Sequence, residues 1–412
     1  MLNPQTPRPH QAPKIIFMPN RTLQYSLIEK PHELDAFYQD HRKLPWIAFD
    51  TEFVGEKRYH TLLCLIQVKS EKGLFLIDPI RLKGLDPFLD LVADPNITKI
   101  THAGDNDYRL LNNLFGVLPR NVFDTQIAAG FVGYKYPVSF RKLVEDELGV
   151  HLKKGYAVAD WEGRPFQANQ LQYALNDVLF LPDLWERLAK KLEGQNRTHW
   201  ADEELALLEK AEYYYKDPND EAIKSNMMRA LKTKEQLFLL RLFAWRRQVA
   251  EQRDHSKEMV LPAKYIGHIV RSISSGREAL KHNRRIPGKM ADKYGATFEE
   301  LYKRPVSDEE RQILKRIPSE NDEDPKEQII MEMLYQVIKY KCLEEDISIN
   351  MVVPRGELKK IRADEDDALE LLAGGWRQEM LGAYFLDWLS NANRMKVELH
   401  ENRIVIRPEE HV

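Results

Sequence analysis

Two carboxylates stand close together where an apolar run ends, and their spacing suggests metal chemistry. The segment Ala48-Phe-Asp-Thr-Glu-Phe-Val54 places Asp50 and Glu52 two positions apart. Side chains at i and i+2 of a strand point to the same face. Two carboxylates on one face of a buried strand need cations, hydrogen bonds or protonation. A pair of divalent ions meets that need, whereas a strand end with a turn-forming Asp is the structural alternative.

A further carboxylate, that of Asp107, follows the apolar run at 97–101 in the segment His102-Ala-Gly-Asp-Asn-Asp-Tyr108. The preceding Gly104 lets the backbone turn sharply, so we expect the Asp107 carboxylate to project beyond the strand ends. Asp105 stands where a helix N-cap is expected, and we assign it that structural role.

The segment at 170–181 has helical periodicity and contains Tyr173 and Asp177, four positions apart. That spacing puts the phenol and the carboxylate on one helix face, one turn apart. A Tyr-x-x-x-Asp pair alone fits an amphipathic helix with a core tyrosine equally well. The order of the three acidic segments along the chain is what favours a shared site.

These residues need a sheet and a helix to bring them together, and the surrounding pattern predicts both. Short apolar runs at 46–49, 62–68, 74–77 and 97–101 indicate strands, and helical periodicity dominates from Tyr108 onward. This alternation predicts an α/β or α+β domain with a mixed sheet covered by helices. Residues 226–305 and 326–392 are helix-forming, and 396–407 alternates as a small hairpin would.

The net charge of −3 hides an uneven distribution along the chain. Residues 221–305 carry 19 Lys and Arg against 9 Asp and Glu, while 306–412 carry 15 against 24. Clustered positive charge is typical of nucleic-acid binding, although a charge run is more often a solvated face.

Length and composition exclude several classes of protein. A chain of 412 residues is too long for one core, so we expect two or three domains. The two cysteines, Cys64 and Cys342, are too few for a disulfide framework or a thiolate zinc site, and we interpret them as buried thiols. We find no membrane span and no secretory signal, which predicts a cytoplasmic protein. No phosphate-binding Gly-x-x-x-x-Gly-Lys-Ser/Thr motif is present, so we expect no use of ATP.

The three acidic segments together resemble the DEDD exonuclease superfamily, in its tyrosine-bearing branch. Four motifs are similar to those of the ribonuclease D family, namely His102-Ala-Gly-x-x-Asp, Phe123-Asp-Thr-Gln126, Asp160-Trp-x-x-Arg-Pro165 and Tyr173-Ala-x-x-Asp177. Residues 226–305, with Ala244-Trp-Arg-Arg-Gln-Val-Ala250 and Arg284-Arg-Ile-Pro-Gly288, look like the HRDC domain of helicases and ribonuclease D. The segment Gly375–Gly382 looks like that family's second, more divergent C-terminal module, so the resemblance spans about 26–392.

The resemblance implies a ribonuclease H-like α/β exonuclease domain followed by all-α helical bundles. It implies that Asp50, Glu52, Asp107 and Asp177 hold two Mg²⁺ or Mn²⁺ ions, and that Tyr173 orients the attacking water. Hard divalent ions do prefer carboxylate oxygens, and a pair of them stabilises both the attacking and the leaving oxygen of a phosphoryl displacement. We leave Asp124 and His102 off the metal site and interpret both as supporting residues.

The resemblance also changes how the basic block is interpreted. We expect it to hold RNA, with Arg246, Arg247, Arg284, Arg285 and Lys289 as phosphate contacts. Arg164 is a further candidate for contact with the substrate phosphate, although it could equally pair locally.

The predicted function is 3′-5′ exoribonuclease action by a two-metal mechanism, on RNA with a free 3′ end. The family resemblance suggests tRNA precursors as substrates, and we expect a monomer with no membrane partner. A DNA exonuclease of the same superfamily and a non-catalytic nucleic-acid-binding protein are the alternatives. The expected domains are a disordered tail at 1–25, the exonuclease domain at 26–195, a linker at 196–225, the HRDC domain at 226–305, an acidic linker at 306–325 and a second HRDC-like domain at 326–412.

Overall fold

The computed structural model describes residues 14–18, 21–152, 159–317, 325–353, 372, 374–382, 395–400 and 403–408. The chain divides into two compact units. The first unit consists of Met1–Glu52, Leu63–Tyr214 and Glu323–Val412, and the second consists of Phe53–Leu62 and Tyr215–Asp322. One boundary between the units therefore falls inside a strand, directly after Glu52.

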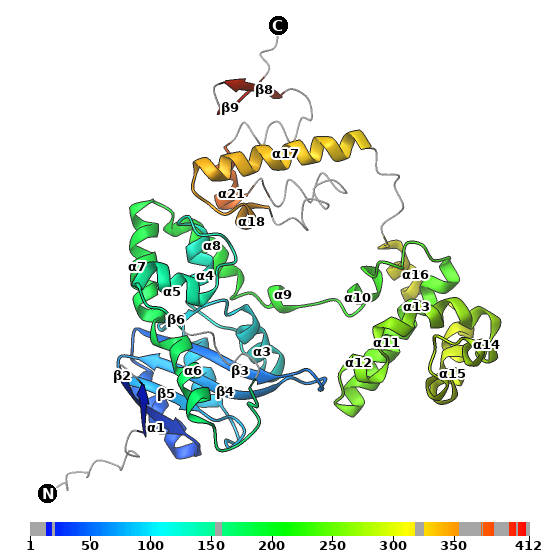
Figure 1. Cartoon of the computed structure of the whole chain (residues 1–412), viewed down its shortest axis with the longest axis horizontal. Helices are drawn as coiled ribbons and strands as arrows, with labels where there is room; N and C mark the ends of the chain where they lie inside the picture. Colours follow the sequence, from blue (N-terminus) through cyan, green and yellow to red (C-terminus); the bar gives the residue numbers. More distant parts are fainter. Residues whose placement is uncertain are drawn as a thin grey trace, which may run out of the picture. The chain divides into compact units, whose positions relative to one another are not determined.

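Within the described residues, the first unit is built on a seven-stranded mixed sheet in the order β1-β2-β5-β4-β3-β6-β7 (Figure 1). Strand β6 runs parallel to both β3 and β7, and β2 runs parallel to β5, whereas β4 is antiparallel to β5 and β1 is antiparallel to β2. The strands are β1 (Lys14–Met18), β2 (Arg21–Ile28), β3 (Trp46–Val54), β4 (Leu62–Ser70), β5 (Gly73–Ile77), β6 (Thr98–Thr101) and β7 (Val122–Asp124).

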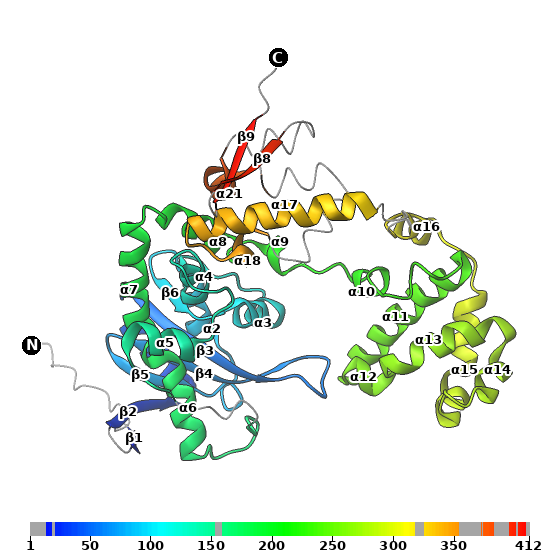
Figure 2. The same cartoon turned by 45° about the horizontal axis from the view of Figure 1, so that its top comes forward.

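The central strands read as continuous apolar runs because helices cover both faces of the sheet. Helices α1, α2 and α3 share one core with Phe49 of β3 and Ile66 of β4. Helices α6 and α7 contact β5 and β6 (Figures 1 and 2). The helices of this part are α1 (Pro31–His41), α2 (Asp86–Ala93), α3 (Asp105–Phe115), α4 (Thr125–Gly130), α5 (Phe140–Leu148), α6 (Ala168–Leu179), α7 (Leu181–Gly194), α8 (Thr198–Leu207) and α9 (Ala211–Tyr214).

The C-terminal part of the chain returns to the first unit. Helices α17 (Pro325–Glu344), α18 (Ile349–Val352) and α21 (Gly375–Leu381) share a core with α4, α7 and α8. The backbone N–H of Trp376 donates to Glu203 at 2.9 Å, and the Arg377 guanidinium pairs with Glu204 at 2.6 Å. Strands β8 (Met395–His400) and β9 (Arg403–Pro408) pair antiparallel, which confirms the hairpin predicted at 396–407.

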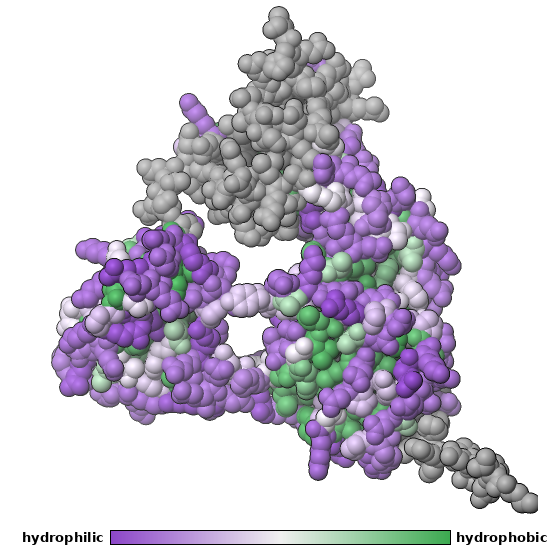
Figure 3. All heavy atoms as spheres, turned by 180° about the vertical axis from the view of Figure 1, so that it is seen from behind, coloured by the Kyte–Doolittle hydropathy of each residue, from purple (hydrophilic) through white to green (hydrophobic). Residues whose placement is uncertain are grey.

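The second unit is a helical bundle around a core that includes Phe238, Leu242 and Phe298. The buried Arg241 guanidinium pairs with Glu310 at 2.6 Å, and this pair joins α11 to α16. In Figure 3 the visible surface of the second unit is largely hydrophilic. The helices are α10 (Asp220–Ile223), α11 (Thr233–Arg253), α12 (Lys257–Val260), α13 (Ala263–Ser272), η1 (Ile273–Ser275), α14 (Arg277–His282), α15 (Gly288–Lys303) and α16 (Asp308–Lys315).

The predicted α/β fold with following helical domains is confirmed, with differences in detail. Strands β1, β2 and β7 were not predicted, and β1 and β2 occupy part of the range expected to be a tail. Helix α8 lies in the range expected to be a linker, yet it buries Trp200, Ala201 and Leu205 in the core of the first unit. Residues 1–13, and the part of the expected acidic linker at 318–324, lie outside the described residues.

Two other expectations bear on the chemistry of the whole chain. Cys64 and Cys342 are both buried thiols and neither forms a disulfide in the described part of the chain, as predicted from their apolar surroundings. None of the described helices combines the length and the apolar character needed to cross a membrane.

Candidate active site

Strand β3 and helix α6 bring three of the predicted carboxylates together. Asp50 and Glu52 lie on β3, and Asp177 lies on the third turn of α6. One oxygen from each of these carboxylates lies within 4.8 Å of the other two. The i, i+2 spacing on the strand therefore produces the shared face that the sequence predicted.

Helix α6 is fixed at its start and along its buried side, which sets the direction of Tyr173 and Asp177. The Gln170 side chain accepts a hydrogen bond from the Gln167 backbone N–H at 2.8 Å, so the first turn is capped. Buried Ala174 anchors the same helix. Tyr173 and Asp177 are joined by a side-chain hydrogen bond, as the i, i+4 spacing allows.

The turn before Asp107 depends on close packing around Gly104. A Cβ atom on Gly104 would lie 2.6 Å from Oγ1 of Thr101, so the position has no room for a larger side chain. The left-handed backbone conformation occurs one residue earlier, at Ala103, with φ of 57°. The sequence therefore identified the correct glycine, but space and not backbone freedom explains it.

Asp107 approaches the other carboxylates from α3 but is held by its own partner. The Thr51 hydroxyl donates a hydrogen bond to Asp107, and Thr51 stands between Asp50 and Glu52 on β3. Beyond the effect of burial, the charge of Asp50 raises the pKa of Asp107, and the charge of Asp107 in turn raises the pKa of Glu52. It is not part of the tight cluster of three, whose oxygens lie within 4.8 Å of one another.

The assignment of Asp105 as the N-cap of α3 is wrong. The N-cap is Gly104, and no side chain caps it. Asp105 is the first helical residue and forms an i, i+4 ion pair with Arg109 at 2.8 Å. A local pair on the helix surface thus replaces the expected cap.

The clustered carboxyl groups have raised pKa values. Burial and then the charges of Asp50, Asp177 and Asp107 raise the pKa of Glu52 to about 9. Burial raises the pKa of Asp177 to about 7, although the Tyr173 hydroxyl opposes that shift. Burial and the neighbouring Asp177 raise the pKa of Asp50 well above its usual range, and burial and Asp50 do the same for Asp107. Like charges placed together in a poorly solvated site resist ionisation.

This donor set fits a hard divalent cation. All the clustered donors are carboxylate oxygens, which Mg²⁺ and Mn²⁺ prefer. The pKa shifts arise from burial and from neighbouring carboxylates, and a bound cation would offset both effects. The site can therefore bind a divalent metal ion.

Asp124 and His102 lie next to the site and support its backbone. Asp124 is buried, caps α4, and accepts hydrogen bonds from the backbone N–H groups of Ala103 at 3.1 Å and Gly104 at 2.7 Å. The His102 ring contacts the Thr125 hydroxyl at 2.9 Å and lies 3.1 Å from the carbonyl oxygen of Val138. Both side chains are thus engaged in holding the turn that carries Asp107.

The guanidinium group of Arg164 is engaged in local pairing, and each of its N–H groups already donates a hydrogen bond. It forms two hydrogen bonds with the Asp78 carboxylate, at 2.7 and 2.8 Å. Its other donors reach the carbonyl oxygens of Trp161, Gly163 and Cys64 at 2.7, 3.0 and 2.8 Å. These contacts account for all five donors of an arginine. Local pairing, the alternative considered for Arg164, is what the structure shows.

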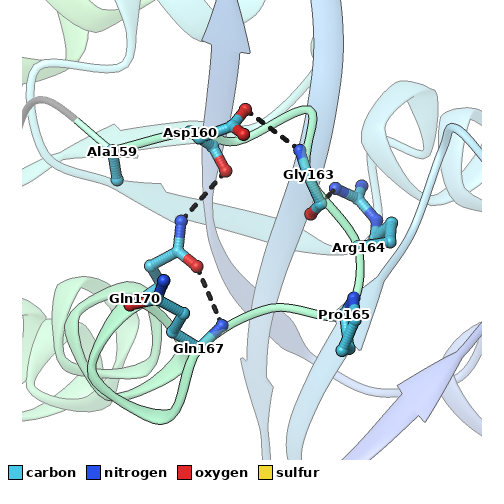
Figure 4. A pocket seen from close by; sticks show the side chains of 7 residues that line it. All are labelled: Ala159, Asp160, Gly163, Arg164, Pro165, Gln167 and Gln170. Atoms are coloured by element: carbon cyan, nitrogen blue, oxygen red, sulfur yellow. Dashed lines mark hydrogen bonds between the residues drawn. The ribbon is translucent and has the colours of Figure 1, made fainter.

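The loop that Arg164 organises borders a cavity of about 340 Å³ at the start of α6 (Figure 4). The Gln170 side chain donates to the Asp160 carbonyl oxygen at 3.0 Å, which ties the loop to the helix. The cavity is lined by Ala159, Asp160, Gly163, Arg164, Pro165, Gln167 and Gln170.

The five cationic residues proposed for the helical unit divide into two groups. The side chain of Arg246 is 4% exposed and pairs with Glu221 and Glu258, so it is internal and unavailable to RNA. Arg247 donates to the carbonyl oxygen of Pro218 at 2.5 Å and is half-buried. The remaining three are exposed, and none forms an ion pair within the described part of the chain; they are Arg284, Arg285 and Lys289.

Sequence reasoning missed two side chains that lie beside the proposed catalytic groups. Thr51 holds Asp107, and its polar side chain on a buried strand was the available signal. Trp161 is 3% exposed, and its ring lies 6.4 Å from that of Tyr173. Trp161 belongs to a motif that the sequence analysis quoted, but no spacing rule connects it with Tyr173.

The chain is similar in sequence to known nucleases. A family model described as a 3′-5′ exonuclease matches residues 25–193. A ribonuclease D of Bartonella henselae is 30% identical over 366 residues, covering 88% of this chain and 89% of that protein. A ribonuclease D of Musicola paradisiaca is 32% identical over 249 residues, covering 60% of this chain and 67% of that protein.

Solved structures agree with these sequence matches. Escherichia coli RNase D, described as an exoribonuclease involved in structured RNA processing, superposes with a TM-score of 0.77 at 26% identity. That match covers 89% of this chain and 99% of the other. The catalytic core of RRP6 from Trypanosoma brucei has a TM-score of 0.56 at 22% identity, covers 71% of this chain and 82% of its own, and shares the fold.

Proposed function

Because this chain belongs to the ribonuclease D family and is a 3′-5′ exoribonuclease, we propose that its active site is the carboxylate cluster on β3, α3 and α6. In this proposal Asp50, Glu52, Asp107 and Asp177 hold two divalent ions, Mg²⁺ or Mn²⁺, and Tyr173 orients the water that attacks the terminal phosphodiester. The supporting observation is the convergence of Asp50, Glu52 and Asp177 to within 4.8 Å from two separate elements.

Bound divalent ions would supply Lewis-acid stabilisation of the charge that develops on the phosphate oxygens. Asp50, Glu52 and Asp177 would provide oxygen ligands for the ions, and the Thr51 hydroxyl fixes the direction of the Asp107 carboxylate. The positions of these side chains set where the scissile phosphate can sit, so they determine the geometry of the displacement.

Tyr173 acts as a hydrogen-bonding group and not as a base. Burial and the nearby Asp177, Glu52 and Asp50 carboxylates raise the pKa of the Tyr173 phenol above its usual value. The phenol therefore stays protonated at neutral pH, and its oxygen can accept a hydrogen bond from the attacking water and so hold that water in place.

The decisive experiment is hydrolysis of 5′-labelled single-stranded RNA and matching DNA, with Mg²⁺, Mn²⁺ or EDTA. We expect a ladder of shortened RNA that disappears with EDTA and with Asp50→Asn. Tyr173→Phe should retain metal binding but lower kcat by roughly 10²-fold, because a misplaced reactant costs about that much. A ladder that persists undiminished in Asp50→Asn would remove Asp50 from the site, and faster degradation of DNA would change the substrate class.

We also propose that Arg284, Arg285 and Lys289 contact RNA phosphates. All three are exposed and lie on or beside the turn between α14 and α15, in the most basic part of the chain. Removing one side chain that binds a phosphate should reduce the slope of log K against log salt by about 0.7 for a single strand.

The matched test compares Arg284→Ala/Arg285→Ala with a control of equal charge change, Lys83→Ala/Lys190→Ala, whose lysines are exposed in the first unit. We expect the arginine double variant to bind RNA more weakly with a shallower salt slope, and the control to be closer to wild type. Equal affinity and slope in the arginine variant and the wild type would refute the phosphate contacts.

As physiological substrates we propose tRNA precursors with 3′ extensions, acted on by a monomer in the cytoplasm. Trimming of an extended tRNA compared with the mature tRNA tests the substrate, and light scattering on the purified protein tests the monomer. The family resemblance supports tRNA precursors as the substrate. The chain also combines a nuclease unit with a basic helical unit, which is consistent with an RNA substrate.

A further inference from the structure

The strand that carries Asp50 and Glu52 continues into a hairpin that belongs to the helical unit. Strand β3 ends at Val54 and β4 begins at Leu62, so residues 55–61 form the connection. The segment Phe53–Leu62 forms a compact unit with Tyr215–Asp322. The catalytic strand thus passes into the second unit immediately after Glu52.

The tip of this hairpin is held by the end of helix α11. Oδ1 of Asp254 accepts hydrogen bonds from the backbone N–H groups of Tyr59 at 3.2 Å and His60 at 2.9 Å. The backbone N–H of Ser256 donates to the carbonyl oxygen of Lys57 at 3.0 Å. The Tyr59 side chain packs against the hydrophobic core of the helical bundle. Together these contacts define an Asp254 clip.

Asp254 is suited to this position by its backbone as well as its carboxylate. It is the C-cap of α11 and has a left-handed conformation with φ of 46° and ψ of 47°. Asp, Asn and Gly tolerate that conformation, whereas most other residues are strained there. Only Asp and Asn among these three offer a side-chain oxygen that can accept the two hairpin N–H groups.

The two arms of the hairpin touch close to the catalytic strand. A Cβ atom added to Gly55 would lie 3.0 Å from Oγ1 of Thr61. Because the arms are in contact and the tip is anchored, a displacement of the tip shifts both arms. Glu52 lies only two residues before the end of β3, so the path from the clip to this carboxylate is one short β-ribbon.

We propose that Asp254 is a positioning residue for the exonuclease reaction, which holds the hairpin tip and thereby fixes the end of β3 that carries Glu52. This inference rests on the proposed role of Glu52 in the active site. Asp254 does not touch the reacting atoms. Its loss frees the hairpin and lets Glu52 sample positions that do not support the reaction.

The experiment compares two substitutions in the full-length protein that both keep the left-handed cap. Asp254→Gly retains the backbone conformation but removes the acceptor, whereas Asp254→Asn retains both the conformation and an acceptor oxygen. Three measurements are made on each variant, namely amide hydrogen exchange at Tyr59 and His60, kcat and KM on an RNA dinucleotide, and kcat and KM on a longer single-stranded RNA.

We expect Asp254→Gly to speed amide exchange at Tyr59 and His60 and to lower kcat about tenfold on both substrates, since small misplacements of catalytic groups are costly. KM on the dinucleotide should change little. Asp254→Asn should resemble wild type in exchange and in kcat, which a simple loss of fold would not produce.

Three results would overturn the proposal. The clip does not exist if exchange at Tyr59 and His60 is unchanged in Asp254→Gly. The clip is not coupled to the active site if exchange rises while kcat on both substrates stays at the wild-type value. An effect confined to KM on the longer RNA would make Asp254 an RNA contact. A wild type that fails to hydrolyse RNA at all would instead refute the proposed function, and this proposal with it.

Discussion

Replacing Arg164 should destabilise the first unit and slow the reaction without weakening contact with RNA phosphate. The Asp78 side chain is 0% exposed, and its two oxygens receive the guanidinium at 2.7 and 2.8 Å. Removing one partner of a buried ion pair typically costs about 3–5 kcal/mol, because the other charge is left buried without compensation. For a unit of this size a loss of about 3 kcal/mol lowers Tm by roughly 6–12 °C.

The same change should affect catalysis through Trp161. Arg164 holds the carbonyl oxygen of Trp161 at 2.7 Å, and the Trp161 ring lies 6.4 Å from the ring of Tyr173. Arg164→Ala should therefore lower kcat, while KM for RNA and its salt dependence stay close to wild type. Arg164→Lys should not restore the protein, since an ammonium group has three donors and cannot reproduce the planar five-donor arrangement.

The assay combines thermal unfolding with steady-state kinetics at several salt concentrations. A double-mutant cycle with Asp78→Ala separates the pair from the remaining contacts, and we expect a coupling of about 0.5–3 kcal/mol. The reasoning is refuted if Arg164→Ala leaves Tm unchanged but raises KM for RNA and reduces its salt slope. That pattern would identify an arginine that contacts phosphate.

Two further predictions follow from the pKa shifts. Asp177 has a raised pKa in the folded protein, about 7, so without metal its contribution to stability is present at low pH and is lost as pH rises from the unfolded value of 3.8 through about 7. Asp177→Asn should therefore abolish activity but raise Tm of the EDTA-treated protein at about pH 8. Added Mg²⁺ should raise Tm of the wild type more than Tm of the variant. A lower Tm in the EDTA-treated variant would contradict the electrostatic repulsion between Asp177 and the neighbouring carboxylates. Glu310 has a pKa lowered to about 2, mainly by the hydrogen bond from Arg241, so its contribution is present above the unfolded value of 4.5 and is lost as pH falls towards about 2. Glu310→Gln should lower the stability of the helical unit near neutral pH and flatten its acid dependence in circular-dichroism melts, whereas parallel acid profiles for variant and wild type would remove this pair as the cause.

Local backbone geometry made part of the site predictable from the order of the amino acids. The alternation of a strand set Asp50 and Glu52 on one face, and the helical repeat set Tyr173 and Asp177 one turn apart. The apolar runs that became β3, β4, β5 and β6 were also readable, because strands covered on both faces need continuous apolar sequence.

The resemblance of the three acidic segments to the family added the expectation of a divalent-metal site, and the carboxylate cluster agrees with that expectation. The sequence relatives confirm the family that these motifs suggested. The motifs did not predict which partner each side chain would meet outside its own element. Asp105 pairs with Arg109 and does not cap its helix, and Arg164 pairs with Asp78.

Partners that lie far apart in the chain could not be predicted and became visible only in the folded protein. Arg164 meets Asp78 across 86 positions, and His60 meets Asp254 across 194, while α21 packs with α8 in the core of the first unit. Arg246 was indistinguishable from Arg284 as a residue type, yet one is internal and the other is exposed. The physical reason is that a repeat of two or of 3.6 residues is fixed by covalent geometry, whereas the pairing of distant side chains depends on how complete elements pack.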